Sequence, residues 1–355
     1  MVTLGVYLMI RGANILNGIS NIMIIIYFIG ALSSLISALT GFSQFDIKKV
    51  IAFSTSSQIG YMITACGSQE YGIAMNHLIN HAFFKAFLFI NAGSIIHYIK
   101  DEQDYRNMGQ IIKTNPWLNL AFILGTFSLI AMPYFSGFYS KDLVLDDLAH
   151  SWSVVLSGRI VYYLQLLTAL ITVIYSFRSY WSIFITSSSS NTYLIKESYL
   201  WPSIILSIPT IIGGYLISDL LVGAGTSYWD GNGIIKITEN EVEEDELLVM
   251  TIILAILGGI IGYILTILNT PSKVLNLLQD RFNFDMIYNN ILASWILREA
   301  KLNYALIDNG LINNYGYNTM MKIGRVIRYS NLDNGFVPIN ILIIVIIVLV
   351  LGILI

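Results

Sequence analysis

The chain has 355 residues, of which 55% are hydrophobic and only 12% charged, whereas about a quarter of the residues are charged in an ordinary soluble domain. Its net charge of −3 leaves no basic field that would attract nucleic acid. A single cysteine, Cys66, excludes an internal disulfide, a cysteine-held iron–sulfur cluster and a cysteine-based zinc site.

The first stretch, Met1–Ile10, is apolar and is followed by Arg11, which reverses the charge order of a cleavable signal peptide. A membrane-spanning helix takes about 20 residues, so this stretch is too short to cross a bilayer. We therefore expect it to be the end of a helix whose beginning is missing.

The later apolar stretches are each close to membrane-spanning length. They are Asn21–Phe42, Val50–Cys66, Tyr71–Tyr98, Trp117–Leu148, Ile160–Ile185, Trp201–Leu221, Leu247–Leu268 and Val337–Ile355. Backbone polar groups in lipid must find partners within their own segment, which favours helices. The sequence predicts an all-α integral membrane protein with about eight full transmembrane helices and a partial first one.

Basic residues gather in alternate loops. If the spans are taken in order, one side collects Lys48, Lys49, Lys100, Arg106, Lys113, Lys196, Lys273, Arg281, Arg298, Lys301, Lys322, Arg325 and Arg328. The other side has Arg11, Arg159, Lys236 and the acidic run Glu239–Glu246. The positive-inside rule places the first side in the cytoplasm or matrix.

The second apolar stretch begins with Asp46, Lys48 and Lys49 and continues into the polar run Ser54–Gln58. Small hydroxyl side chains within a span support helix packing or hold water, and packing is the favoured interpretation for most of this run. For the two lysines the alternative is that they anchor the helix at the membrane surface.

The third stretch carries the strongest functional signal. His77, His81 and Lys85 recur every four residues and therefore form one stripe along a helix. A charge near mid-membrane costs at least about 2.5 kcal/mol, so such residues normally face a partner or a wet cavity. The pattern favours a proton relay. A satisfied structural histidine pair is the main alternative, and a zinc site is disfavoured because the stripe has no carboxylate or cysteine.

The fourth stretch is interrupted between Ala131 and Asp142. Pro133 removes a helical hydrogen bond and Gly137 loosens the backbone four residues later. A discontinuous helix inside a membrane often marks an ion path. Lys141 lies just after the predicted break, with Asp142 beside it; the alternative is a loop lysine between two shorter spans.

The segment between Leu268 and Val337 does not resemble a span. From Asp285 to Asp308 its apolar residues follow helical spacing and are interrupted by charges, which predicts an amphipathic lateral helix of about 36 Å. Gly310 and Gly316 are expected to bend or end it. We therefore divide the chain into a transmembrane bundle (1–270), a lateral segment (271–335) and a terminal membrane anchor (336–355).

These motifs resemble the antiporter-like subunits of respiratory NADH:ubiquinone oxidoreductase (complex I). The resemblance is dense over about residues 1–180. It is carried by Met1–Leu8, Asp46–Met62, His77–Ile96, Asp101–Asp104, Met108-Gly109, Gly137–Asp142 and Tyr175–Arg178. The lateral segment followed by a final span is an arrangement that this family also has.

The resemblance implies a proton-translocating subunit of NADH:ubiquinone reductase, coupled to redox chemistry elsewhere in the complex. It makes His77, His81 and Lys85 the middle of a proton relay. By the same resemblance Lys141 is the terminal proton carrier with Asp142 as its neighbour, and Lys48 with Asp46 is a further polar pair near the channel.

The resemblance also implies surroundings. No cofactor is expected on this chain, while NADH, FMN, iron–sulfur clusters and ubiquinone are expected on other subunits. The expected partners are lipids and the other complex I membrane subunits, especially neighbouring antiporter-like subunits along the lateral segment. The expected location is the mitochondrial inner membrane, multi-pass, with the positive loops and lateral helix on the matrix side. Family members have further helices before the point where Met1 falls, so a fragment, a split protein with a separate chain, or a late-starting gene model is expected.

Two other functions remain open at this stage. The same superfamily includes subunits of multi-subunit sodium/proton antiporters. A non-pumping structural membrane subunit is the alternative from a different class.

Overall fold

The computed structural model describes residues 2–152, 156–186, 201–222, 244–268, 277–329 and 337–353. The chain divides into two units, Met1–Phe282 and Asn283–Ile355. The three-part division that was expected from the sequence stays a prediction.

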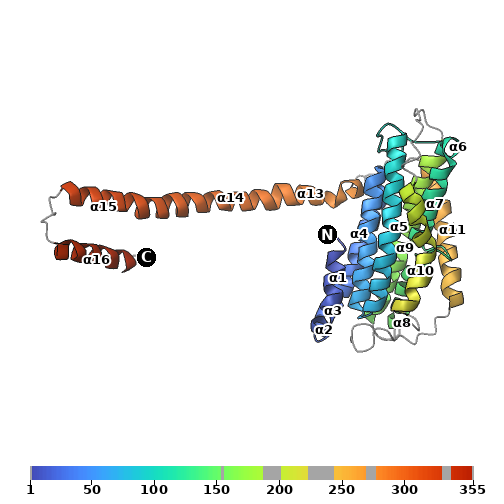
Figure 1. Cartoon of the computed structure of the whole chain (residues 1–355), viewed down its shortest axis with the longest axis horizontal. Coiled ribbons are helices and arrows are strands. Elements are labelled where there is room, and N and C mark those ends of the chain that lie inside the picture. Colours follow the sequence, from blue (N-terminus) through green and yellow to red (C-terminus); the bar gives the residue numbers. More distant parts are fainter. Residues whose placement is uncertain are drawn as a thin grey trace. The chain divides into compact units, whose positions relative to one another are not determined.

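The first unit is a bundle of long helices that run beside one another (Figure 1). Its helices are α1 (Leu4–Arg11), α2 (Ala13–Leu16), α3 (Ser20–Ser43), α4 (Ile47–Gly67), α5 (Tyr71–Tyr98), α6 (Ile111–Thr114), α7 (Pro116–Ile130), η1 (Phe138–Asp142), α8 (Leu143–Trp152), α9 (Leu156–Phe184), α10 (Trp201–Leu221), α11 (Glu244–Leu268) and the short η4 (Arg281–Asn283). The expected basic residues Lys196, Lys236 and Lys273 lie outside the described residues.

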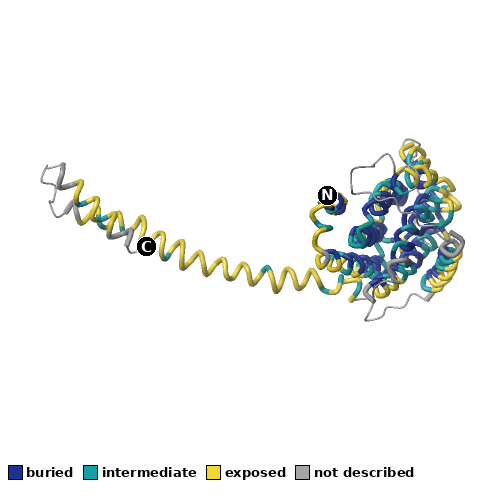
Figure 2. The backbone as a smooth tube through the Cα atoms, turned by 90° about the horizontal axis from the view of Figure 1, so that it is seen from below, coloured by how far each residue is buried: buried dark blue, intermediate teal, exposed yellow. Residues whose placement is uncertain are grey.

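The bundle is apolar on the outside. Among the described residues, 5 helices are long and apolar enough to cross a membrane, namely the main parts of α3, α5, α9, α10 and α11. Their outer faces expose large aliphatic side chains such as Ile25, Ile205 and Ile260, while buried residues face the bundle interior (Figure 2). Exposed aliphatic side chains are stable in contact with lipid, so the prediction of an all-α membrane protein is confirmed.

The three other expected spans differ from these helices in length or polarity. Helix α4 has 21 residues but carries the polar run from Ser54 to Gln58. The fourth stretch is divided into α7, of 15 residues, and α8, of 10 residues. The terminal helix α16 (Val337–Ile353) has 17 residues. The count of about eight spans therefore stays a prediction, because these three segments are shorter or more polar than the 5 apolar helices.

Close packing and polar contacts join α3, α4 and α9 in the interior. A Cβ atom on Gly60 would lie 2.6 Å from Ser34 Cβ, so only glycine allows α3 and α4 to approach this closely. Ser34 Oγ donates to Gln165 Oε1 at 3.1 Å, and Gln165 Nε2 donates to Thr64 Oγ1 at 2.8 Å. The polar side chains of these helices thus satisfy one another away from lipid.

One end of the bundle is closed by the loop between α5 and α6. Tyr105 N donates to Phe45 O at 3.1 Å, which pairs this loop with the residues before α4. In the loop, partial burial would raise the pKa of Asp104, but hydrogen bonds and charge from Arg106 outweigh it and hold the pKa below its ordinary value. The basic residues Lys48 and Arg106 therefore lie at the same end of the bundle, as the alternation of loop charges requires.

Arg178 of α9 ties this end together. Its guanidinium donates from Nη1 to Phe42 O at 2.8 Å and lies 4.8 Å from the ring centre of Phe45. The side chain is only 8% exposed, so Arg178 does not reach out to solvent. A planar guanidinium can stack and donate at once, which a lysine cannot do.

Replacing Arg178 by methionine is expected to lower the free energy of unfolding by about 2 kcal/mol, because the Phe42 carbonyl loses a charged donor. Arg178→Lys should lose most of the same stability, since it keeps the charge but not the stacking. Denaturant titration of the purified chain in detergent would measure both, with the exposed Lys113→Met as control. Equal stability of Arg178→Met, Arg178→Lys and Lys113→Met would show that Arg178 does not stabilise this end of the bundle.

The second unit contains α16 and, before it, a helix that is continuous through five elements. These are α13 (Phe284–Met286), η5 (Ile287–Ala293), α14 (Ser294–Asn303), η6 (Tyr304–Tyr317) and α15 (Asn318–Tyr329). Apolar side chains such as Trp295 and Leu306 are exposed along it. Gly310 and Gly316 do not end the helix, contrary to expectation: both lie inside η6, where the backbone widens to a π-helix and continues into α15. The wider turns let the chain absorb two glycines without a break.

Candidate functional site

The basic stripe of α5 faces the interior of the first unit. His77 is 0%, His81 3% and Lys85 4% exposed. The ring centres of the two histidines are 6.1 Å apart, one helical turn along the same face. The periodicity of four therefore brings these three side chains together, as the sequence predicted.

His77 is held on both sides by neighbouring helices. Its Nε2 atom lies 3.0 Å from Gln58 Oε1 of α4, and its Nδ1 atom lies 3.0 Å from Ser140 Oγ of η1. Both ring nitrogens are thus occupied by hydrogen bonds, which argues against a zinc ion on His77 and His81. His77 instead connects α4, α5 and the discontinuous helix.

Lys85 and His81 make contrasting contacts. The ammonium of Lys85 donates to Ser54 Oγ and reaches Ile51 O at 3.5 Å, both on α4. Within the described part of the chain, neither ring nitrogen of His81 has a hydrogen-bond partner, and its ring lies edge-on to Phe84 with centres 5.3 Å apart. Buried polar atoms normally have partners, so His81 differs from His77 in that the described side chains do not fix its ring nitrogens.

Lys141 and Asp142 form the second charged group of the interior. Both are buried, in the π-helical turn that opens the second half of the discontinuous helix. Lys141 Nζ donates to Thr172 Oγ1 of α9 at 3.3 Å and lies 5.4 Å from the ring centre of Tyr61. Within the described residues, neither carboxylate oxygen of Asp142 has a hydrogen-bond partner. Opposite charges on neighbouring residues make burial of the pair less costly than burial of either alone.

The break in this helix is real and is supported by α10. Helix α7 ends where Ala131 takes a φ of 67°, and Ser136 N donates to Thr210 O of α10 at 3.3 Å. Ser128 and Ser136 are joined through their Oγ atoms at 2.8 Å. The N–H group of Ser136, within the break, is therefore satisfied by protein, which a break inside a membrane requires.

Asp46 and Lys48 lie apart from this buried set. Asp46 is the N-cap of α4, where Oδ1 accepts from Lys48 N at 2.8 Å, and the side chain of Lys48 is exposed. A capping carboxylate satisfies free backbone N–H groups at a helix start. The relay role given to this pair by the family resemblance stays a prediction.

Several buried polar residues around the basic side chains were not singled out from the sequence as site residues. They are Gln58, Ser54, Ser140 and Thr172, together with the ring of Tyr61. Ser54 and Gln58 belong to a polar run for which packing was favoured, and Ser140 lies next to Lys141. Thr172 carries no sequence signal of its own beyond being a hydroxyl within an apolar span.

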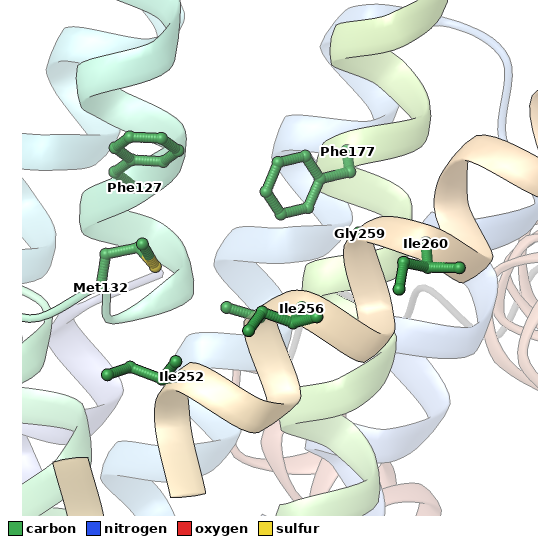
Figure 3. A pocket seen from close by; sticks show the side chains of 8 residues that line it. Phe127, Met132, Phe177, Ile252, Ile256, Gly259 and Ile260 are labelled. Carbon is green, nitrogen blue, oxygen red and sulfur yellow. The ribbon is translucent and has the colours of Figure 1, made fainter. Parts of the chain in front are cut away.

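A separate hollow of about 300 Å³ lies between α7, α9 and α11 (Figure 3). Its walls are apolar, with Phe127, Met132, Phe177, Ile256 and Ile260 among them. None of these side chains can exchange a proton, so the hollow does not belong to the polar set on α5.

Residues 1–172 match a family model described as NADH:quinone oxidoreductase/Mrp antiporter, transmembrane. The chain is 35% identical to NADH-ubiquinone oxidoreductase chain 5 of Arabidopsis thaliana, over 95% of this chain and 54% of the relative. The chain 5 protein of Rhizopus stolonifer is also 35% identical, over 95% of this chain and 55% of the relative. The chain 5 protein of Chondrus crispus is 37% identical, over 88% of this chain and 51% of the relative.

The chain thus spans about half the length of the curated relatives that it matches. Among solved structures, one chain of the Mrp complex from Dietzia sp. has the same fold, with a TM-score of 0.68 and 19% sequence identity. That likeness covers 93% of this chain and 36% of the other.

Proposed function

Because residues 1–172 of this chain match the NADH:quinone oxidoreductase/Mrp antiporter transmembrane family, we propose that it is a proton-translocating membrane subunit of a respiratory NADH:ubiquinone oxidoreductase. It would then be part of an enzyme, the proton-translocating NADH:ubiquinone reductase. NADH, FMN, iron–sulfur clusters and ubiquinone are proposed to bind other subunits. Relatives at 35% identity over 95% of the chain support this assignment.

The observation that carries the proposal is the set of basic side chains buried inside an apolar bundle. His77, His81, Lys85 and Lys141 are each less than 5% exposed. Ionisable side chains inside a membrane are costly and normally serve a proton or ion path. Their positions on α5 and on the discontinuous helix place them along the interior instead of on the lipid face.

The proton path that we propose runs along α5 and then to the discontinuous helix. A proton on Lys85 passes to His81 and His77 through ordered water, and Lys141 is the terminal carrier, with Asp142 balancing its charge. Hydroxyl and amide groups of α4 and α9 hold the carriers in place through their hydrogen bonds. Ordered water can join polar groups that are too far apart for a direct hydrogen bond.

The proposed setting is the mitochondrial inner membrane, with the end that carries Lys48 and Arg106 on the matrix side. The exposed apolar side chains of the second unit are proposed to pack against neighbouring antiporter-like subunits. Lipid covers the remaining outer faces of the bundle. Further helices, which the relatives' greater length provides, are proposed to come from the rest of a longer protein or from a separate chain.

Two alternatives remain distinguishable by experiment. The matched family includes Mrp antiporters, and the fold likeness to the Mrp complex favours a sodium/proton antiporter subunit as the second function. A structural subunit that does not move protons is the other.

The test uses the assembled complex in sealed vesicles with a pH-sensitive dye. A triple variant, His81→Gln with Lys85→Met and Lys141→Met, is expected to lower the protons moved per NADH by at least the share of this subunit, while Lys49→Met leaves it unchanged. Normal proton transport in the triple variant would identify a structural subunit. Sodium-dependent proton transport without NADH would identify an antiporter instead.

A further inference from the structure

Ser140 is placed between a titratable ring and the backbone of the discontinuous helix. Its Oγ atom lies 3.0 Å from His77 Nδ1, 3.2 Å from Ser136 O and 3.5 Å from Gly137 O. The side chain is 0% exposed. A hydroxyl has a single hydrogen to donate, so it can serve the ring or the backbone carbonyl, but not both at once.

Gln58 determines which nitrogen of the neutral His77 ring carries the hydrogen. Its Oε1 atom faces His77 Nε2 at 3.0 Å, and an amide oxygen only accepts hydrogen bonds. Nε2 therefore carries the hydrogen of neutral His77, which leaves Nδ1 as an acceptor. In this state Ser140 must donate to Nδ1.

A second proton on His77 reverses that bond. Both nitrogens of an imidazolium donate, so the hydroxyl of Ser140 must accept from Nδ1 and turn its own hydrogen to Ser136 O. On the proposed path the proton comes from protonated His81, whose N–H bond breaks as the Nδ1–H bond of His77 forms. The O–H bond of Ser140 stays intact, and only its direction changes. The groups that act on His77 by charge are Lys85 on its own helix and Lys141 in η1, with His81 one turn away.

We propose that Ser140 is a positioning residue whose hydroxyl reports the protonation of His77 to the backbone of the discontinuous helix, directly before Lys141. The proposal rests on the proton-translocating function proposed above. With the hydroxyl turned, the imidazolium has an oxygen acceptor on each nitrogen, from Gln58 and from Ser140. Hydrogen bonds from a charged donor are stronger than neutral ones, so this arrangement stabilises the charged ring selectively.

The carbonyl that receives the hydroxyl belongs to the break itself. Ser136 N donates to Thr210 O of α10, and Ser136 Oγ bonds Ser128 Oγ of α7. Charging of His77 therefore adds a hydrogen bond to the residue that joins both halves of the discontinuous helix to α10. The His77 ring on α5 is thus connected through hydrogen bonds to the turn that carries Lys141.

The first test measures the tautomer and the protonation of the His77 ring, and it does not depend on proton transport. The chain has 4 histidines, so ¹⁵N-histidine labelling of the full chain in lipid vesicles gives few solid-state NMR signals, and His77→Gln identifies the relevant one. Wild-type His77 is expected to be the Nε2–H tautomer when neutral. In Ser140→Ala the ratio of imidazolium to neutral ring should fall about tenfold at a given pH, whereas Ser140→Thr, which keeps the hydroxyl, stays within about twofold.

The second test measures NADH-driven proton transport by the assembled complex, which should slow about tenfold in Ser140→Ala and be restored in Ser140→Thr. A wild-type Nδ1–H tautomer, or an unchanged ring in Ser140→Ala, would overturn the proposal while leaving the proton-translocating function intact. The expected NMR response in a complex that moves no protons would support the hydroxyl reversal and count against the proposed function alone.

Discussion

Replacement of Lys141 by methionine is expected to slow proton translocation through this subunit by about 100-fold, the low end of what a positioned proton donor contributes. Methionine has nearly the length of lysine and can occupy the same buried space, so packing against Tyr61 is retained. What is lost is the only group at this position that can carry a proton. The readout is the rate of vesicle acidification by the assembled complex at a fixed NADH oxidation rate.

A matched control comes from an exposed lysine that has no part in the proposed path. Lys49→Met removes a lysine whose side chain is exposed at the start of α4, and it should leave the rate within about twofold. Equal losses in both variants would show that the buried location of Lys141 is not what matters.

In Lys141→Met the buried carboxylate of Asp142 also loses the opposite charge beside it. Asp142 has no hydrogen-bond partner for either oxygen within the described residues, and removing a buried ion partner commonly costs about 3–5 kcal/mol. The double variant Lys141→Met with Asp142→Asn is neutral and should restore assembly without restoring transport. An unchanged number of protons per NADH in either assembled variant would refute Lys141 as the terminal carrier.

Sequence periodicity was sufficient for the parts of this molecule that one helix decides alone. The spacing of His77, His81 and Lys85 fixes them on one face, and Pro133 with Gly137 fixes where the fourth stretch is interrupted. The apolar lengths of α3, α5, α9, α10 and α11 fix their membrane-spanning character. In each case the information lies within a few turns of one segment.

Contacts between helices could not be predicted from the sequence in the same way. His77 meets Gln58 on α4 and Ser140 on η1 because of the crossing and rotation of three helices, and no local pattern records that register. Thr172 meets Lys141 across the bundle for the same reason. A polar residue within an apolar span signals that it has a partner, but the tertiary packing decides which one.

The glycines also show which features one segment determines and which depend on packing between helices. Gly310 and Gly316 were expected to bend or end the lateral helix. They do not end it, because a glycine only weakens a helix by about 1 kcal/mol and the π-helical turns of η6 accommodate both. In α10, by contrast, two adjacent glycines look alike in the sequence and have different surroundings. Only the structure distinguishes a glycine that packing requires from one that it tolerates.

Gly214→Ala is therefore expected to damage the molecule while Gly213→Ala does not. A Cβ atom on Gly214 would lie 2.5 Å from Ser136 Cα and 2.7 Å from Ser136 O, both backbone atoms that cannot move aside alone. A Cβ atom on Gly213 would meet Pro209 Cβ at 3.6 Å and Asn80 Oδ1 at 3.7 Å, which is ordinary contact. Overpacking of this kind costs about 1–3 kcal/mol.

The two substitutions share the same gain in helix propensity, so the difference between them isolates the contact of α10 with the break. Gly214→Ala should push α10 away from Ser136, lengthen the 3.3 Å bond from Ser136 N to Thr210 O, lower Tm and slow proton transport about tenfold. Gly213→Ala should keep both Tm and transport at or slightly above wild type. The comparison is made on purified complex by thermal unfolding and on vesicles by dye quenching. Identical behaviour of the two variants would mean that the discontinuous helix does not depend on α10 for its shape, because of the two sites Gly214 is the one where an added methyl group would clash with the backbone of Ser136.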